Sequence, residues 1–271
     1  MLKNSQTYNK LGYFFHEKLF EKKIHKQIVD EIFSLANLFS KKIKKFSKKK
    51  KIKNLNDLDN FCKQLESYNK DYFFNFISSV SNLKTLNCTI LNSKIFDLSS
   101  KILEEPKESL LISRVSFLVN LPKNKRVLYN WHNAKNAYPK RNKCLNYWMP
   151  LILNKNLKNG TLEICEQSHK REEYPFLEYK NKEIKNSLTQ NQIPDAEFKN
   201  LRKKKINLSV GSVMGMHHNI VHRSTFNSSS KCSFVCVFKV WSIAKDWTLS
   251  SQLNQKYFSG DDGAGEDIII T

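Results

Sequence analysis

Two histidines about ninety residues apart are the side chains of this sequence best suited to chemistry. His132 follows a tryptophan, and His222 precedes an arginine and a serine. A mononuclear iron centre takes two histidines and one carboxylate on one face of the metal and leaves the other face open. Because residues two apart on a strand point to the same side, the carboxylate is expected two positions after the first histidine. That position is Ala134.

No nearby side chain is predicted to replace the missing carboxylate. Asn133 and Lys135 point to the other face of a regular strand. Asn136 shares the face of His132, but it lies roughly 13 Å further along at about 3.3 Å per residue. We therefore expect two protein ligands, His132 and His222, with water or a distant residue in the third position.

Further short motifs surround the two histidines in a fixed order. They are Tyr138-Pro139, Trp-Met-Pro-Leu at 148–151, Asn-Gly-Thr-Leu-Glu at 159–163, Gln-Ser-His-Lys at 167–170, Gly-Ser-Val at 211–213 and Asn-Ser-Ser at 227–229. With this set the chain resembles the phytanoyl-CoA dioxygenase family of iron(II)/2-oxoglutarate oxygenases over about residues 114–240. Each motif alone is weak evidence, whereas the ordered set is strong evidence for the fold.

The resemblance implies a role for particular residues. His132 and His222 are the implied iron ligands, and the implied cofactors are Fe(II) and 2-oxoglutarate. The implied cosubstrate-binding residues are Lys231, Ser233, Ser224 and Thr161, and the implied substrate pocket contains Tyr138, Trp148 and Asn133.

The cosubstrate position departs from the family pattern. Family members carry an arginine eleven residues after the distal histidine, where it binds the tail carboxylate of 2-oxoglutarate; here that residue is Ser233. Lys231 lies two residues earlier on the same face of a strand, and a lysine binds a carboxylate as a point charge. Our hypothesis is that Lys231 takes over, with Ser233 beside it; the alternative is a solvated loop lysine.

Three functions follow from these departures. The first is a 2-oxoglutarate-dependent oxygenase that hydroxylates a small molecule. The second is a halogenase-like variant with chloride in place of the missing carboxylate, although such enzymes keep the cosubstrate arginine. The third is a catalytically inactive jelly-roll protein, a pseudoenzyme, that binds a metabolite or partner.

The elements that position these residues fall into three predicted regions. Residues 1–108 are predicted to be helical, because apolar residues recur at steps of three and four, as at Ile28, Ile32 and Leu35. Residues 109–245 carry short alternating apolar runs, with a polar insertion or lid at 169–205, and residues 246–271 form an acidic tail. Residues 158–160 are expected to form a hairpin turn. The predicted class is mixed α+β, with a double-stranded β-helix (a cupin-like jelly roll) flanked by N-terminal helices.

Composition narrows the partners and the compartment. The net charge is +21. The excess is mostly lysine spread along the chain, so we interpret it as a basic surface and not as a nucleic-acid interface. The six cysteines form no C-x-x-C pair, which argues against structural zinc and for reduced thiols. No apolar run is long enough to span a membrane, and the first residues lack the apolar run typical of a secretion signal, so we expect a cytoplasmic protein. The family resemblance implies a small-molecule substrate.

Overall fold

The computed structural model describes residues 2–43, 46, 51–113, 115–134, 143–180, 189–243 and 268–269. Its helices are α1 (Leu2–Leu11), α2 (Lys22–Lys42), α3 (Leu55–Tyr68), α4 (Lys70–Ser81), α5 (Lys84–Leu91) and α6 (Ile95–Leu103). The apolar stripe predicted for α2 is present, with Ile28 and Ile32 buried and Leu35 packed against the same core. Asn54 and Asn69 accept hydrogen bonds from backbone amides of the first turns of α3 and α4, which explains why those helices begin there.

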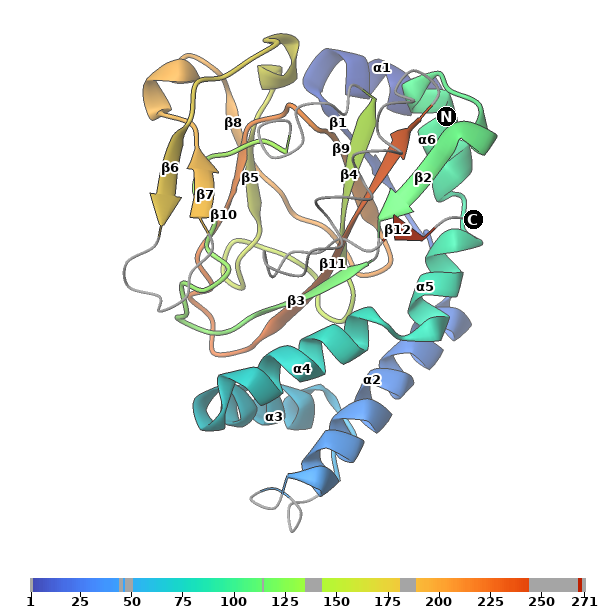
Figure 1. Cartoon of the computed structure of the whole chain (residues 1–271), viewed down its shortest axis with the longest axis vertical. Coiled ribbons are helices and arrows are strands. Elements are labelled where there is room, and N and C mark those ends of the chain that lie inside the picture. Colours follow the sequence, from blue (N-terminus) through green and yellow to red (C-terminus); the bar gives the residue numbers. More distant parts are fainter. Residues whose placement is uncertain are drawn as a thin grey trace.

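The strands form two antiparallel sheets and a separate hairpin (Figure 1). The larger sheet has the order β1-β9-β4-β11-β2-β12, with β3 also paired to β11, and the smaller sheet has the order β10-β5-β8. The strands are β1 (Tyr13–His16), β2 (Leu110–Ser113), β3 (Ser116–Asn120), β4 (Cys144–Pro150), β5 (Leu162–Cys165), β6 (Leu177–Lys180), β7 (Thr189–Gln192), β8 (Lys203–Lys205), β9 (Val213–His217), β10 (His222–Ser224), β11 (Ser233–Ser242) and β12 (Ile268–Ile269).

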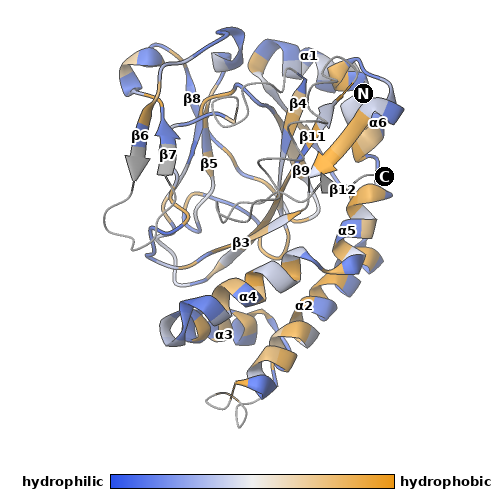
Figure 2. Ribbon diagram, in the orientation of Figure 1, coloured by the Kyte–Doolittle hydropathy of each residue, from blue (hydrophilic) through white to orange (hydrophobic). Residues whose placement is uncertain are grey.

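Alternation along each strand divides the core into two layers. On β4, Tyr147 and Met149 pack with the helices, whereas Trp148 belongs to a cluster shared by the two sheets. That second cluster, which we call the inter-sheet core, also contains Met214 from β9 and Ile164 from β5. Figure 2 shows hydrophobic residues along β2 and β11 and mixed colouring along α2, as expected for a helix with one buried side.

These two layers confirm the predicted mixed α+β class. Three local elements differ from those predicted from the sequence. β1 lies within the region expected to be helical, because Tyr13 and Phe14 add an edge strand to β9. The 169–205 region contains the β6–β7 hairpin and β8, whose polar residues gave no alternating signal. The 158–160 turn joins β4 to β5, which lie in different sheets, so it is not a hairpin turn. Among the described helices, none is long and apolar enough to cross a bilayer.

Candidate metal and cosubstrate site

The two predicted metal ligands lie side by side. The backbone amides of His132 and His222 each donate to the other residue's carbonyl, at 2.9 Å in both directions. The centroids of the two imidazole rings are 4.3 Å apart. β10 sets the direction of the second ring, since His222 is in register with Ile164 of the inter-sheet core. Both rings therefore face the space between the sheets.

Hydrogen bonding sets the tautomer of both histidines. Nδ1 of His132 lies 2.6 Å from the carbonyl oxygen of Asn130, and Nδ1 of His222 lies 3.0 Å from that of Ile220. A carbonyl oxygen only accepts, so Nδ1 of each ring carries the proton and Nε2 keeps its lone pair. Burial lowers the pKa of both imidazoles, and the pKa of His222 falls to about 3, with the neighbouring His132 contributing. Both rings are thus neutral near pH 7 and available as metal ligands.

The third protein ligand is the missing part of this site. The backbone amide of Ala134 donates a hydrogen bond to the carbonyl oxygen of His218. The methyl group of Ala134 has no atom that can bind a metal. Glu163 is the buried carboxylate on the strand next to His222, but it faces away from the ring and pairs with Arg223 at 2.6 Å. No group of three histidine, cysteine or acidic side chains that suits a metal occurs among the described residues. The donor set fits a divalent metal held by two imidazole nitrogens, with the other positions left to exogenous ligands.

The remaining predicted residues divide between the inter-sheet space and structural roles. Trp148 lies in the inter-sheet core, and Ser224 is in register with Leu162 on the side of His222. The Thr161 hydroxyl donates to the carbonyl of Ile206, and the Asn133 amide donates to Asn219 at 2.8 Å. Those two side chains are therefore used to hold loops together. Tyr138 lies outside the described residues.

Of the two alternatives considered for Lys231, the structure agrees with a loop lysine. Its ammonium donates to Asn56 and lies 3.8 Å from Asp59, so it points toward α3. The cause is local, because Lys231 precedes β11 and belongs to the loop that covers α3. Ser233 is completely buried, and its hydroxyl contacts a different lysine, Lys155, at 2.5 Å. No motif indicated Lys155, which is 78 residues from Ser233 in the sequence.

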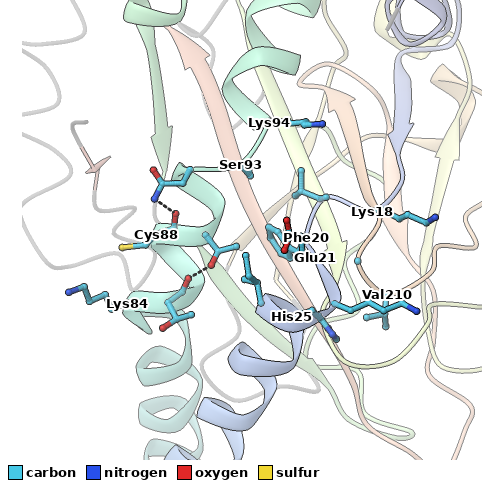
Figure 3. Close-up of a pocket in the computed structure, with 16 residues that line it drawn as sticks. Lys18, Phe20, Glu21, His25, Lys84, Cys88, Ser93, Lys94 and Val210 are labelled. Atoms are coloured by element: carbon cyan, nitrogen blue, oxygen red, sulfur yellow. Dashed lines mark hydrogen bonds between the residues drawn. The ribbon is translucent and has the colours of Figure 1, made fainter.

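A large open cleft lies elsewhere, on the outer side of the larger sheet (Figure 3). It has a volume of about 990 Å³ and is lined mainly by the start of α2, by α5 and by the Gly211 turn. Lys18, Lys84 and Lys94 extend around it, and His25 lies at its edge. Neither of the two paired histidines lines this cleft, so it is separate from the candidate metal site.

Comparison with known proteins identifies the family of the chain. The chain belongs to the phytanoyl-CoA dioxygenase family, because the family model matches residues 17–233. No curated protein matches the chain.

Solved structures with the same architecture include non-heme enzymes. One is EvdO2 from Micromonospora carbonacea var. aurantiaca, at 13% identity and a TM-score of 0.58, covering 89% of this chain and 90% of that one. A second is the alpha ketoglutarate dependent carbocyclase SnoK from nogalamycin biosynthesis, at 13% identity and a TM-score of 0.55. The match covers 93% of this chain and 90% of that one. A third is the epimerase SnoN in complex with Fe3+, alpha ketoglutarate and nogalamycin RO, at 13% identity and a TM-score of 0.53. The match covers 89% of this chain and 83% of that one. These likenesses establish the fold and confirm the predicted double-stranded β-helix.

Proposed function

We propose that this protein is an iron(II)- and 2-oxoglutarate-dependent oxygenase that hydroxylates a small molecule. The observation that supports the proposal is the paired arrangement of His132 and His222, with both Nε2 lone pairs unprotonated between the sheets. Family membership supplies the expected cofactors. When bound, iron(II) with 2-oxoglutarate supplies oxygen activation, with succinate and carbon dioxide as coproducts.

The residues of the chain have two tasks in this proposal. The backbone carbonyls of Asn130 and Ile220 hold the two imidazoles in the metal-binding tautomer and restrict their rotation. The inter-sheet core includes Ile164, which is in register with His222, and in this proposal its apolar side chains limit the access of water to the site.

Ala134 supports a second candidate function. A methyl group at the carboxylate position leaves one further metal position for an exogenous anion. A chloride ion there would make the protein a halogenase-like variant of the same oxygenase. The two candidates share their protein ligands and differ in whether a halide binds the metal.

Anaerobic titration with iron(II) and then 2-oxoglutarate tests the proposal. We expect visible charge-transfer absorption from the chelated 2-oxo acid, and we expect it to shift with chloride only if the second candidate is correct. Ala134→Asp supplies the absent carboxylate and is expected to strengthen iron binding. Ala134→Asn is the control, because asparagine has the shape of aspartate without its charge. Absorption in Ala134→Asp but not in the natural chain would reject both catalytic candidates and favour a jelly-roll binding protein.

A further inference from the structure

Lys155 is a buried lysine that the site described above does not explain. Only 3% of its surface is exposed. It lies in the connection between β4 and β5, where its backbone forms an antiparallel bridge with Leu208 through hydrogen bonds of 2.8 and 3.1 Å. Leu208 belongs to the inter-sheet core. The bridge therefore holds the backbone of Lys155 against the interior of the β-helix.

The surroundings of the ammonium contain no counter-charge. Its Nζ lies 2.5 Å from the hydroxyl oxygen of Ser233, 3.4 Å from the carbonyl oxygen of Asn159 and 5.9 Å from the centre of the Trp148 ring. No ion pair to a carboxylate is formed by Lys155 within the part of the chain that the structure describes. A buried cation without a partner is destabilising unless a ligand neutralises it.

The geometry also leaves hydrogen-bonding capacity unused. The Ser233 hydroxyl donates to Asn159 at 2.8 Å, so it accepts from Lys155. A lysine has three N–H donors, and here one bond is short and one is long, which leaves a donor for a ligand. Burial lowers the pKa of Lys155 to about 7, and an anion bound to the ammonium would stabilise its charged form.

Ser233 shares the inner face of β11 with Val235, a member of the inter-sheet core. The β5–β10 ladder that positions His222 continues to the bridge between Asn159 and Asn227. Gly160 in this ladder has a φ of +75°, and a side chain there would meet Asn120 and Thr225, so only glycine suits the turn. The strand pairing that positions His222 thus extends to Asn159, whose carbonyl oxygen lies beside the Lys155 ammonium.

On the basis of the proposed function, we propose that Lys155, positioned by Ser233, binds the distal carboxylate of a dicarboxylate cosubstrate of the 2-oxo acid class. The single charge of one ammonium matches the single charge of a carboxylate, and the remaining N–H of Lys155 can donate to a carboxylate oxygen. A phosphate carries nearly two charges and three acceptor oxygens, which one ammonium would leave partly unneutralised. Lys155 then performs the task expected of Lys231, from a different strand connection.

Calorimetric binding of two 2-oxo acids tests this assignment. 2-Oxoglutarate has the distal carboxylate and 2-oxobutyrate lacks it, so their affinity ratio isolates this subsite. We expect Lys155→Met to weaken 2-oxoglutarate binding by roughly 10- to 100-fold, the range for a hydrogen bond to a charged group, and to leave 2-oxobutyrate unchanged. Lys158→Met, which removes an exposed lysine of the same connection, is the matched control.

Relocation of the charge provides a second test. In Lys155→Met/Ser233→Arg the guanidinium enters the space that the lysine leaves, and we expect the preference for 2-oxoglutarate to return. Ser233→Ala retains the lysine and is expected to lose less 2-oxoglutarate affinity than Lys155→Met does. This variant keeps the test valid should Lys155→Met fail to fold. Equal loss of both 2-oxo acids, or no loss, in Lys155→Met would overturn the assignment.

Metal binding separates this inference from the proposed function. Iron(II) binding to the natural chain, with an affinity ratio that does not depend on Lys155, would reject the subsite and leave the oxygenase proposal standing. A Lys155-dependent preference for 2-oxoglutarate without any iron binding would support the subsite and reject the oxygenase.

Discussion

Asp59 on the helix side of the larger sheet and the paired histidines on its inner side differ in whether the chain itself uses their hydrogen-bonding capacity. On the helix side, Asp59 of α3 accepts hydrogen bonds from the backbone amide of Cys232 at 2.6 Å and from Lys63 at 2.7 Å. Burial alone would raise the pKa of Asp59, but these hydrogen bonds hold it below its ordinary value. On the inner side, Nε2 of each paired imidazole keeps its lone pair, and among the described residues no carboxylate pairs with the Lys155 amine.

This contrast separates structural polar groups from candidate functional ones. A buried group whose bonds are all made within the chain stabilises the fold, whereas one with remaining capacity carries an energetic cost that a ligand can offset. His217 illustrates the difference within one residue type. It accepts a hydrogen bond at Nδ1 from the amide of Asn219, which places its proton on Nε2, and its ring packs on Tyr8. Its tautomer is the opposite of that of His132 and His222.

The largest expected effect concerns the inner histidines. His132→Ala or His222→Ala is expected to reduce iron(II) affinity by more than about 100-fold, beyond the 10–100-fold cost of losing an outer partner of a ligand. His16→Ala, which replaces a histidine of β1, is the control and should change the iron(II) affinity by no more than about twofold. Anaerobic iron titration measures all three. Retention of affinity in either inner variant would show that the pair is not the metal site.

The next effect concerns the helix side. Asp59→Asn removes the charge that satisfies Lys63 and the Cys232 amide, and we expect it to lower the free energy of unfolding by about 2–4 kcal/mol. Iron affinity should not change, because α3 lies on the opposite side of the sheet. Urea unfolding and iron titration of the same variant provide the two readouts, and a change in affinity without a loss of stability would contradict the contrast between the faces.

The third effect is a pH dependence of stability. Lys155 has a pKa of about 7 in the folded chain and an ordinary value of 10.5 when unfolded. Between these values the unfolded chain binds more protons, so the free energy of unfolding should rise as pH increases from 7 to 9. Trp148, Ser233 and Asn159, which surround the ammonium, carry no charge and do not titrate in this range.

Lys155→Met checks that assignment. The variant is expected to lose this rise and to be more stable than the natural chain at pH 7, by on the order of 1–4 kcal/mol. Urea unfolding at pH 7, 8 and 9 measures the slope. An unchanged slope in the variant would show that other groups produce the pH dependence.

The smallest effect is expected at Lys231. Its side chain is 46% exposed and its contact with Asp59 is at 3.8 Å, so Lys231→Ala should cost less than about 1 kcal/mol. Binding of 2-oxoglutarate should be unaffected. A selective loss of 2-oxoglutarate affinity in this variant would restore the role predicted from sequence and would weaken the case for Lys155.

The sequence by itself determined the fold class, the two histidines and the departure at Ala134. These inferences depend on local patterns, since alternation along a strand specifies which side chains share a face. The ordered motifs predicted that segments containing His132 and His222 come together, and the structure places the two rings in contact. Their role as ligands stays a prediction.

Only the tertiary structure decided which cation meets Ser233. The hypothesis for Lys231 came from its place two residues before Ser233, but the Lys231 side chain contacts Asn56 of α3. Lys155 reaches Ser233 because its connection pairs with Leu208 and crosses between the two sheets. Contacts of this kind depend on how strands far apart in the sequence pack around the core. A local pattern of residue types does not predict that packing.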